Sequence, residues 1–244
     1  MGTTRTAAAI GRLGGRPGET EIVNLGDRAS AVPSVLYVDD DGTLVVGEAA
    51  ERRAVTEPDH VAREFKRRVG DPTPLVVGGR SWAPEELSAR LVRWVVERVA
   101  QREGGHATRI AVTHPASWGT HKKDRLGTAL AGQGIPVTYL AEPQAAALHY
   151  AAAERVEPGS TIAVYDFGGG TFDAASCTRR RTGSRCWAAP RASSGSAGST
   201  STRSCSSTSC RGCRRRSRAW TRATRRCCRP SPRSGATAGR PRRR

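Results

Sequence analysis

The apolar positions along residues 1–176 follow two periods in turn, the alternation typical of strands and the three-to-four-residue spacing of helices. Short apolar runs bounded by Gly, Asp or Pro predict strands at residues 21–25, 34–38, 44–46, 109–113, 136–140 and 161–166. Helical patterns predict helices that begin at Pro84 and that cover residues 121–131 and 143–154. Strands and helices that alternate in this way are typical of a mixed α/β domain.

The helix that begins at Pro84 has the clearest two-sided pattern. Proline at the first helical position and the acids that follow it are both favourable at a helix N-terminus. Apolar residues then recur at every fourth position, and we expect Trp94 to pack beside them. The predicted buried stripe is Leu87, Leu91, Val95 and Val99.

The composition of the chain changes sharply near residue 176. Residues 1–176 hold all 22 acidic residues and 20 of the 40 basic residues, so their formal charge is −2, and residues 177–244 carry the other 20 basic residues that make the whole chain +18. All seven cysteines also lie in this second part. Because a Ser-, Arg- and Cys-rich segment with few aliphatic residues cannot bury a core, we expect one folded domain at 1–176 and a disordered tail at 177–244.

The most informative motif follows the last predicted strand. Asp166 ends the apolar run, and Gly168, Gly169, Gly170 and Thr171 come before Asp173. Glycines let backbone N–H groups approach an anion, a threonine adds a hydroxyl donor, and an aspartate at a strand end can hold a hydrated Mg²⁺. The motif therefore predicts a phosphate-binding turn between two strands, and the alternative is an ordinary glycine-rich hairpin turn.

This motif and five others, in the same order, resemble the nucleotide-binding domain of the DnaK-type, seventy-kilodalton heat-shock chaperones. The resemblance covers residue 2 to about residue 175. Its other segments are Gly2-Thr3-Thr4, residues 32–35 with 47–50, and residues 65–70, 112–116 and 141–147.

The resemblance implies the first lobe of an actin-like, ribonuclease-H-like ATPase fold, with ATP or ADP and Mg²⁺ as ligands. It implies that the two glycine-threonine loops cradle phosphates, that Lys66 stabilises the γ-phosphate, and that Pro115 couples nucleotide state to the interdomain surface. It also implies that Mg²⁺, through water, and the attacking water are held by Glu142, Asp166 and Asp173. The partners it implies, for an intact relative, are unfolded client proteins and co-chaperones.

Each of these assignments has a simpler alternative when the residue is taken alone. Lys66 lies in a Lys-Arg-Arg run, which is typical of a solvated helix face. Glu142 precedes a proline and can be an acidic helix start. Thr3 and Thr4 can be ordinary residues near a frayed end, and Pro115 can simply end a strand. The five histidines, His114 among them, show no metal-ligand spacing.

The chain departs from the family pattern on both sides of the resemblance. The family has an apolar strand and an aspartate before the first phosphate loop, and here Met1 precedes Gly2 directly. After the second loop the family has a second lobe that clamps the nucleoside, and here the Arg-rich segment follows. We therefore expect weak nucleotide binding and little ATP hydrolysis.

We interpret residues 177–244 as a frameshifted reading of the family's own sequence. In a shifted frame, codons allowed for residues 182–192 can read DGFEVLGRPEG, and those for residues 193–206 can read IERLGGIDFDEVVL. The string LGGIDFD resembles what the family carries next. One event of this kind explains both the missing acids and the excess of cysteine.

Two other functions remain open for the chain. The arginine-rich tail can bind nucleic acid through its phosphates, without sequence specificity, although only Trp187 and Trp220 are available for base stacking. Another actin-fold member, such as a sugar kinase or a filament protein, is disfavoured by the segments at 65–70 and 141–147. We expect no membrane span, no zinc site in the tail and, from the cysteine-free first 176 residues, a cytoplasmic protein.

Overall fold

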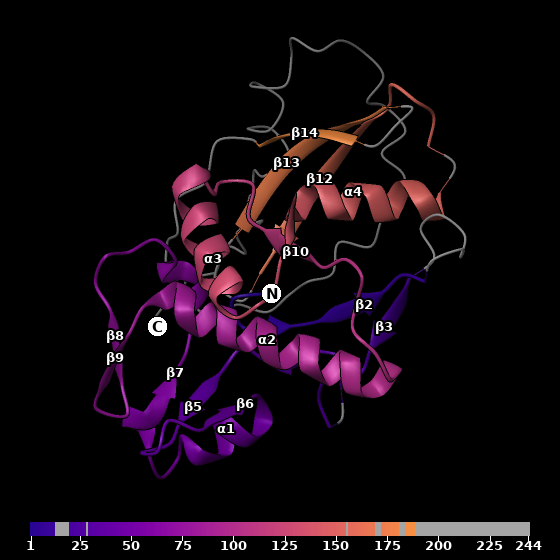
Figure 1. Cartoon of the computed structure of the whole chain (residues 1–244). Coiled ribbons are helices and arrows are strands. Elements are labelled where there is room, and N and C mark those ends of the chain that lie inside the picture. The colour runs from indigo at the N-terminus through magenta and orange to yellow at the C-terminus, as the bar shows by residue number, and fades with distance from the viewer. Residues whose placement is uncertain (13–19, 28, 155, 169–171, 181–183, 189–244) are drawn as a thin grey trace, which may run out of the picture. The chain divides into compact units, whose positions relative to one another are not determined.

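A computed structural model describes residues 1–12, 20–27, 29–154, 156–168, 172–180 and 184–188 (Figure 1). These residues form mixed α/β structure, which confirms the predicted fold class at that level. The part of the predicted disordered tail from residue 189 onward lies outside the described residues.

The helices agree with the sequence pattern to within a few residues at their ends. The described helices are α1 (Glu48–Arg53), α2 (Pro84–Glu103), α3 (Thr120–Gly132) and α4 (Glu142–Ala153), with the 3₁₀ turns η1 (Pro58–His60) and η2 (Phe65–Arg68). Helix α2 has Pro84 in its first turn and is capped by the following Gly104, whose φ of 69° is the left-handed conformation that commonly ends a helix.

The strands of the described residues are short and pair in six separate small sheets. They are β1 (Arg5–Thr6), β2 (Ala8–Ile10), β3 (Glu21–Val23), β4 (Val32–Pro33), β5 (Leu36–Val38), β6 (Leu44–Val46), β7 (Val61–Ala62), β8 (Leu75–Val77), β9 (Arg80–Trp82), β10 (Ala111–His114), β11 (Thr138–Ala141), β12 (Thr161–Phe167), β13 (Phe172–Arg179) and β14 (Ser184–Ala188). All the strand pairs are antiparallel except β10–β11.

Helix α2, the longest described helix, contributes residues to three separate hydrophobic clusters. Leu87 and Leu91 pack with the residues of β5–β9, and Ala89 and Val92 pack with α3 and β10. The C-terminal half of the helix covers Val23, Leu25 and Val32 with Trp94, Val95 and Val99. The predicted stripe and the predicted packing of Trp94 are therefore confirmed.

The last sheet, β12–β13–β14, carries α4 on one face (Figure 1). Its two longer strands form a hairpin whose register places Asp166 opposite Asp173. The sheet continues past residue 176, because β13 runs to Arg179 and β14 pairs with it. The Arg179 guanidinium donates to the carbonyls of Ala151 and Val156, and so ties the end of β13 to the C-terminal end of α4.

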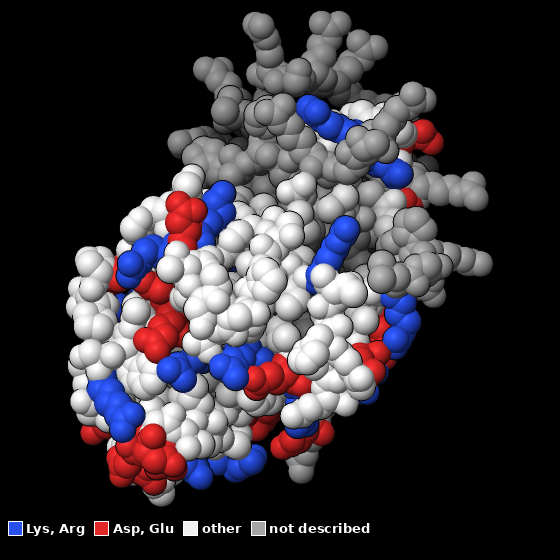
Figure 2. All heavy atoms as spheres, viewed as in Figure 1, with Lys and Arg blue, Asp and Glu red and all other residues white. Residues whose placement is uncertain are grey.

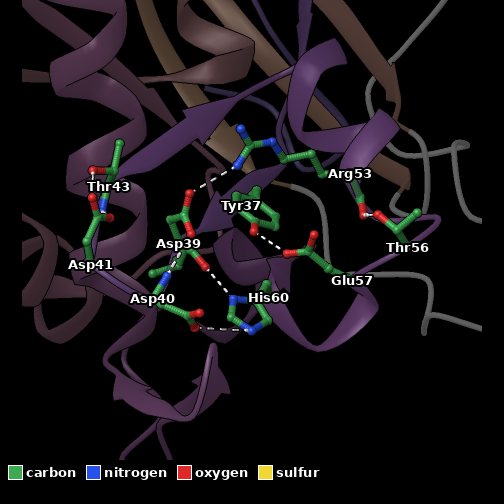
Figure 3. Close-up of polar contacts among 10 residues, drawn as sticks. Tyr37, Asp39, Asp40, Asp41, Thr43, Arg53, Thr56, Glu57 and His60 are labelled. Atoms are coloured by element: carbon green, nitrogen blue, oxygen red, sulfur yellow. Dashed lines mark hydrogen bonds and ion pairs between the residues drawn. The ribbon is translucent and has the colours of Figure 1, made fainter.

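A polar cluster fixes α1 and the following loop against β5 (Figure 3). The buried Tyr37 donates its hydroxyl to Glu57, and this hydrogen bond raises the pKa of the phenol. The Arg53 guanidinium lies 4.6 Å from the Tyr37 ring centroid and 3.2 Å from Asp39 Oδ2. His60 Nδ1 donates to the carbonyl of Val38 at 2.7 Å, which ties the 3₁₀ turn η1 to β5.

Charged residues of both signs are interleaved on the face of the molecule seen in Figure 2. This mixture agrees with the nearly neutral composition of residues 1–176. In the part of the chain that the structure describes, none of the helices has the length and apolar character needed to cross a membrane.

Candidate functional site

The candidate site lies at the carboxyl ends of the two parallel strands. Val112 pairs with Tyr139 and His114 pairs with Ala141, so β10 and β11 end at the same level. The chain leaves β10 through the turn that starts at Pro115, and it leaves β11 directly into α4 at Glu142. Ligand sites of α/β proteins commonly form at such strand ends, because the connecting segments diverge there.

A small cavity opens between these two exits and the β12–β13 hairpin. Its volume is about 20 Å³, which is room for a water or an ion and far too little for a nucleotide. Three carboxylates of the predicted site, Glu142, Asp166 and Asp173, contribute to its wall. The remaining lining residues are Pro115, Ala116, Ser117, Pro143, Val164, Ala174 and Ala175.

Lys66 reaches the same place from a distant part of the chain. Its Nζ lies 2.6 Å from Glu142 Oε1, and only 6% of the Lys66 side chain and 21% of the Glu142 side chain are exposed. Glu64, the one described non-glycine residue with a positive φ (53°), turns the chain into η2 just before Phe65 and Lys66. The alternative of a solvated helix face for Lys66 is therefore wrong, because its ammonium is buried against a carboxylate.

The first predicted phosphate loop begins beside this ion pair. The Ser34 hydroxyl donates to the carbonyl of Gly2 at 2.9 Å, and the Ser34 amide donates to the carbonyl of Thr4 at 2.8 Å. A Cβ at Gly2 would lie 2.1 Å from the Arg5 carbonyl oxygen, so the turn requires glycine there. Burial lowers the pKa of the Met1 amino group to about 6, and repulsion by Lys66 adds to this effect.

The second predicted phosphate loop is described only in part. Gly168 follows β12 and is exposed, whereas Gly169, Gly170 and Thr171 lie outside the described residues. The strands on either side bring Asp166 and Asp173 opposite each other, as a turn between two strands requires.

His114 is a residue of this site that the sequence analysis left without a role. The residue is 8% exposed, its Nδ1 lies 2.8 Å from the carbonyl oxygen of Pro115, and its ring stacks on Trp118. The position directly before Pro115 at a predicted strand end was a usable signal. The absence of ligand spacing among the histidines concealed it, because that criterion finds only metal ligands.

The donor set suits a hydrated Mg²⁺ better than a directly chelated metal. Within the described ranges, no three His, Cys, Asp or Glu side chains lie close enough together to chelate one ion. Glu142, Asp166 and Asp173 nevertheless border one cavity. Mg²⁺ usually keeps several of its waters, so carboxylates that contact those waters are sufficient ligands. The Lys66 ammonium next to Glu142 adds a positive group of the kind that a phosphate requires.

A comparison with protein-family models matches the part of the chain that contains the residues lining this cavity. The model described as Hsp70 protein matches residues 74–183, which include Pro115, Glu142, Asp166 and Asp173, while Lys66 and residues 2–4 precede the match. Membership implies an actin-like ATPase fold and the binding of ATP with Mg²⁺ in that family. Residues 74–183 therefore belong to the Hsp70 family, a lineage of ATP-dependent chaperones, as a partial match that is consistent with a fragment of the nucleotide-binding domain.

Proposed function

We propose that this chain is part of a DnaK-type chaperone, namely the first lobe of its nucleotide-binding domain, and that the cavity at the ends of β10 and β11 receives the phosphate end of Mg-ATP or Mg-ADP. The main support for the proposal is one buried ion pair. Lys66 and Glu142, which are 76 residues apart in the sequence, form a buried ion pair beside two further carboxylates. Buried charges of this kind are uncommon unless they are paired, and they are frequent at functional sites.

The roles follow from charge and position. Lys66 would hold a terminal phosphate oxygen, since an ammonium is the complement of that charge. Glu142, Asp166 and Asp173 would accept hydrogen bonds from the water shell of Mg²⁺ or from an attacking water. The backbone at Gly2, Thr3 and Thr4, with that of residues 168–171, would donate to the phosphates. When bound, the metal nucleotide supplies the phosphoryl group whose charge these residues stabilise.

We further propose that binding is weak and hydrolysis slow. A cavity of about 20 Å³ cannot enclose a nucleoside, so the base and sugar would remain largely in water. Lys66 would also have to exchange its contact with Glu142 for one with phosphate. Clients and co-chaperones, for an intact relative, and a cytoplasmic location are proposed on the family relationship and the cysteine-free first 176 residues.

Equilibrium binding of a fluorescent ADP analogue to the full chain, with and without Mg²⁺, tests the proposal. We expect Mg²⁺-dependent binding with a dissociation constant far above the micromolar range and a thermal shift of at most a degree or two with Mg-ATP. Lys66→Met should abolish binding, whereas the exposed Arg63→Met serves as the matched control and should not change it. Binding unaffected by Lys66→Met would contradict the proposed site, and stabilisation by several degrees would contradict the weakness.

For residues 177–244 we propose a frameshift origin, as the composition indicates. Sequencing of the source DNA across the codons for residues 174–182 decides this, because an inserted or lost base must be found there. The second candidate function is non-specific nucleic-acid binding by the 20 arginines of this segment. It predicts affinity that falls steeply with salt and is equal for unrelated sequences, and discrimination between sequences would contradict it.

A further inference from the structure

His114 lies at the end of β10, directly before a residue that lines the cavity. It is the last residue of β10, and Ala141 of β11 is its partner in the parallel register. The next residue after each of them, Pro115 and Glu142, lines the cavity. A side chain at this position can therefore influence how the turn after β10 faces the start of α4.

The imidazole makes one directed contact and two packing contacts. Because a carbonyl oxygen can only accept, His114 Nδ1 carries the hydrogen and donates it to Pro115 at 2.8 Å. The ring stacks on Trp118 with a centroid distance of 6.2 Å and an interplanar angle of 18°. It meets Tyr139 of β11 edge-on, at 6.0 Å and 72°.

The Pro115 carbonyl receives a second hydrogen bond, from the backbone amide of Trp118 at 3.0 Å. This second bond closes a tight turn over residues 115–118, and the His114 bond ties the same oxygen back to the strand end. Pro115, Ala116 and Ser117, the residues inside this turn, all line the cavity. Two donors thus hold the carbonyl oxygen of the first residue of that wall.

Burial of an imidazole costs more free energy than burial of a hydrocarbon ring of similar size. Burial of its polar nitrogens away from water is unfavourable unless they form hydrogen bonds, and an aromatic hydrocarbon ring would stack on Trp118 without that cost. The feature that a hydrocarbon ring cannot supply is the Nδ1–H donor. The donor, and not the volume of the ring, is therefore the property to which a role can be assigned.

We propose that His114 is a positioning residue, which acts through the Pro115 carbonyl to hold the turn at residues 115–118 in the orientation that faces Glu142 and Asp166 across the cavity. The inference rests on the proposed function, in which this cavity receives the phosphate end of a metal nucleotide. His114 itself does not contact the ligand.

Three substitutions separate the donor from the ring. His114→Asn places an amide N–H near the Nδ1 position, His114→Gln places one near the Nε2 position, and His114→Phe keeps the stacking but has no donor. If His114 only packs, Phe is the best replacement and Asn the worst. If it positions the turn, Asn is the best replacement, and Phe and Gln are both poor.

Two measurements on the full chain use this set of variants. The first is the dissociation constant of the fluorescent ADP analogue with Mg²⁺, which should rise about 5- to 10-fold for Phe and Gln, the size that one hydrogen bond commonly contributes, and less than 2-fold for Asn. The second is hydrogen exchange of the Trp118 amide relative to amides of α2. It should accelerate by a similar factor for Phe and Gln but not for Asn.

The outcomes separate this inference from the proposed function. If the wild-type chain does not bind the analogue, the proposed function fails, and exchange of the Trp118 amide alone then decides whether His114 holds the turn. Rescue by Asn in the exchange measurement supports the inference. Equal exchange in all variants, or an order in which Phe is closest to wild type, overturns it whether or not the nucleotide binds.

Discussion

The ion pair between Lys66 and Glu142 is open to a quantitative test by a double-mutant cycle. The perturbations are Lys66→Met, Glu142→Gln and the two together, since both replacements keep most of the side-chain volume and remove the charge. Two unit charges 2.6 Å apart attract by about 6 kcal/mol at an effective dielectric constant near 20. Desolvation of the two groups offsets much of this attraction, because both side chains are largely buried.

The expected net values follow from what each single substitution leaves behind. Removal of one member of a buried pair costs about 3–5 kcal/mol, because the other charge then has no partner. Glu142→Gln should be the more damaging change, since it leaves the more deeply buried Lys66 next to the Met1 amino group. The double variant should cost less than the two single costs added, with a coupling energy of about 2 kcal/mol, as for a hydrogen bond between charged groups.

Urea denaturation of the four proteins at pH 7, followed by circular dichroism, gives the coupling energy. The exposed pair Arg93–Glu97, at 2.7 Å on α2, provides a control cycle in which about 0.3–0.5 kcal/mol is expected. A coupling energy at Lys66–Glu142 no larger than that of the control pair would refute the reasoning. The two residues would then contribute to stability independently, and the buried contact could not be an energetic feature of the site.

Three further predictions concern stability. The free energy of unfolding should rise by about 2 kcal/mol from pH 6 to pH 8, because the unfolded chain binds a proton at the Met1 amino group that the folded chain, with its pKa near 6, releases. Measurement of the free energy of unfolding across this pH range tests the prediction, and N-terminal acetylation should remove the rise. Arg125→Ala should lower the melting temperature more than Glu85→Gln does. Loss of Arg125 leaves the buried Glu85 carboxylate without its partner, whereas Glu85→Gln leaves only a half-exposed guanidinium. Equal losses in melting temperature would contradict this. Leu91→Ala should cost about 2–5 kcal/mol in urea denaturation and Val55→Ala, at a residue that is 85% exposed, less than about 0.5 kcal/mol; similar losses for both would contradict the assigned core.

The elements that the sequence predicted well are those that local chemistry determines. Helix α2 could be recognised from Pro84, the acids after it and the fourfold spacing of its apolar residues, all of which act within a few turns. The ends of β10 and β11 moved by one to two residues relative to the pattern, because strand ends depend on the partner. Their parallel pairing could not be predicted from either strand alone.

In the candidate site, too, features that depend on neighbouring residues could be predicted, and features that depend on distant residues could not. The glycine motif located Asp166 and Asp173, since a hairpin of this kind brings its own flanking residues together. The burial of Lys66 could not be predicted from the surrounding Lys-Arg-Arg run, because it depends on Glu142, 76 residues further along the chain. The contact of His114 could not be predicted for a related reason. Its partner is a backbone carbonyl, and every residue has one, so the sequence does not indicate which carbonyl is used.

The shared position of helix α2 in three clusters should determine how this protein unfolds. Six small sheets with no strand in common provide no continuous hydrogen-bonded ladder through which one part of the described chain could support another. Three hydrophobic clusters instead use the same helix as a wall. Fraying of one hairpin can remain a local event, but loss of α2 exposes all three clusters at once. The amides of α2 should therefore mark the cooperative unit of the domain and exchange only when it unfolds as a whole.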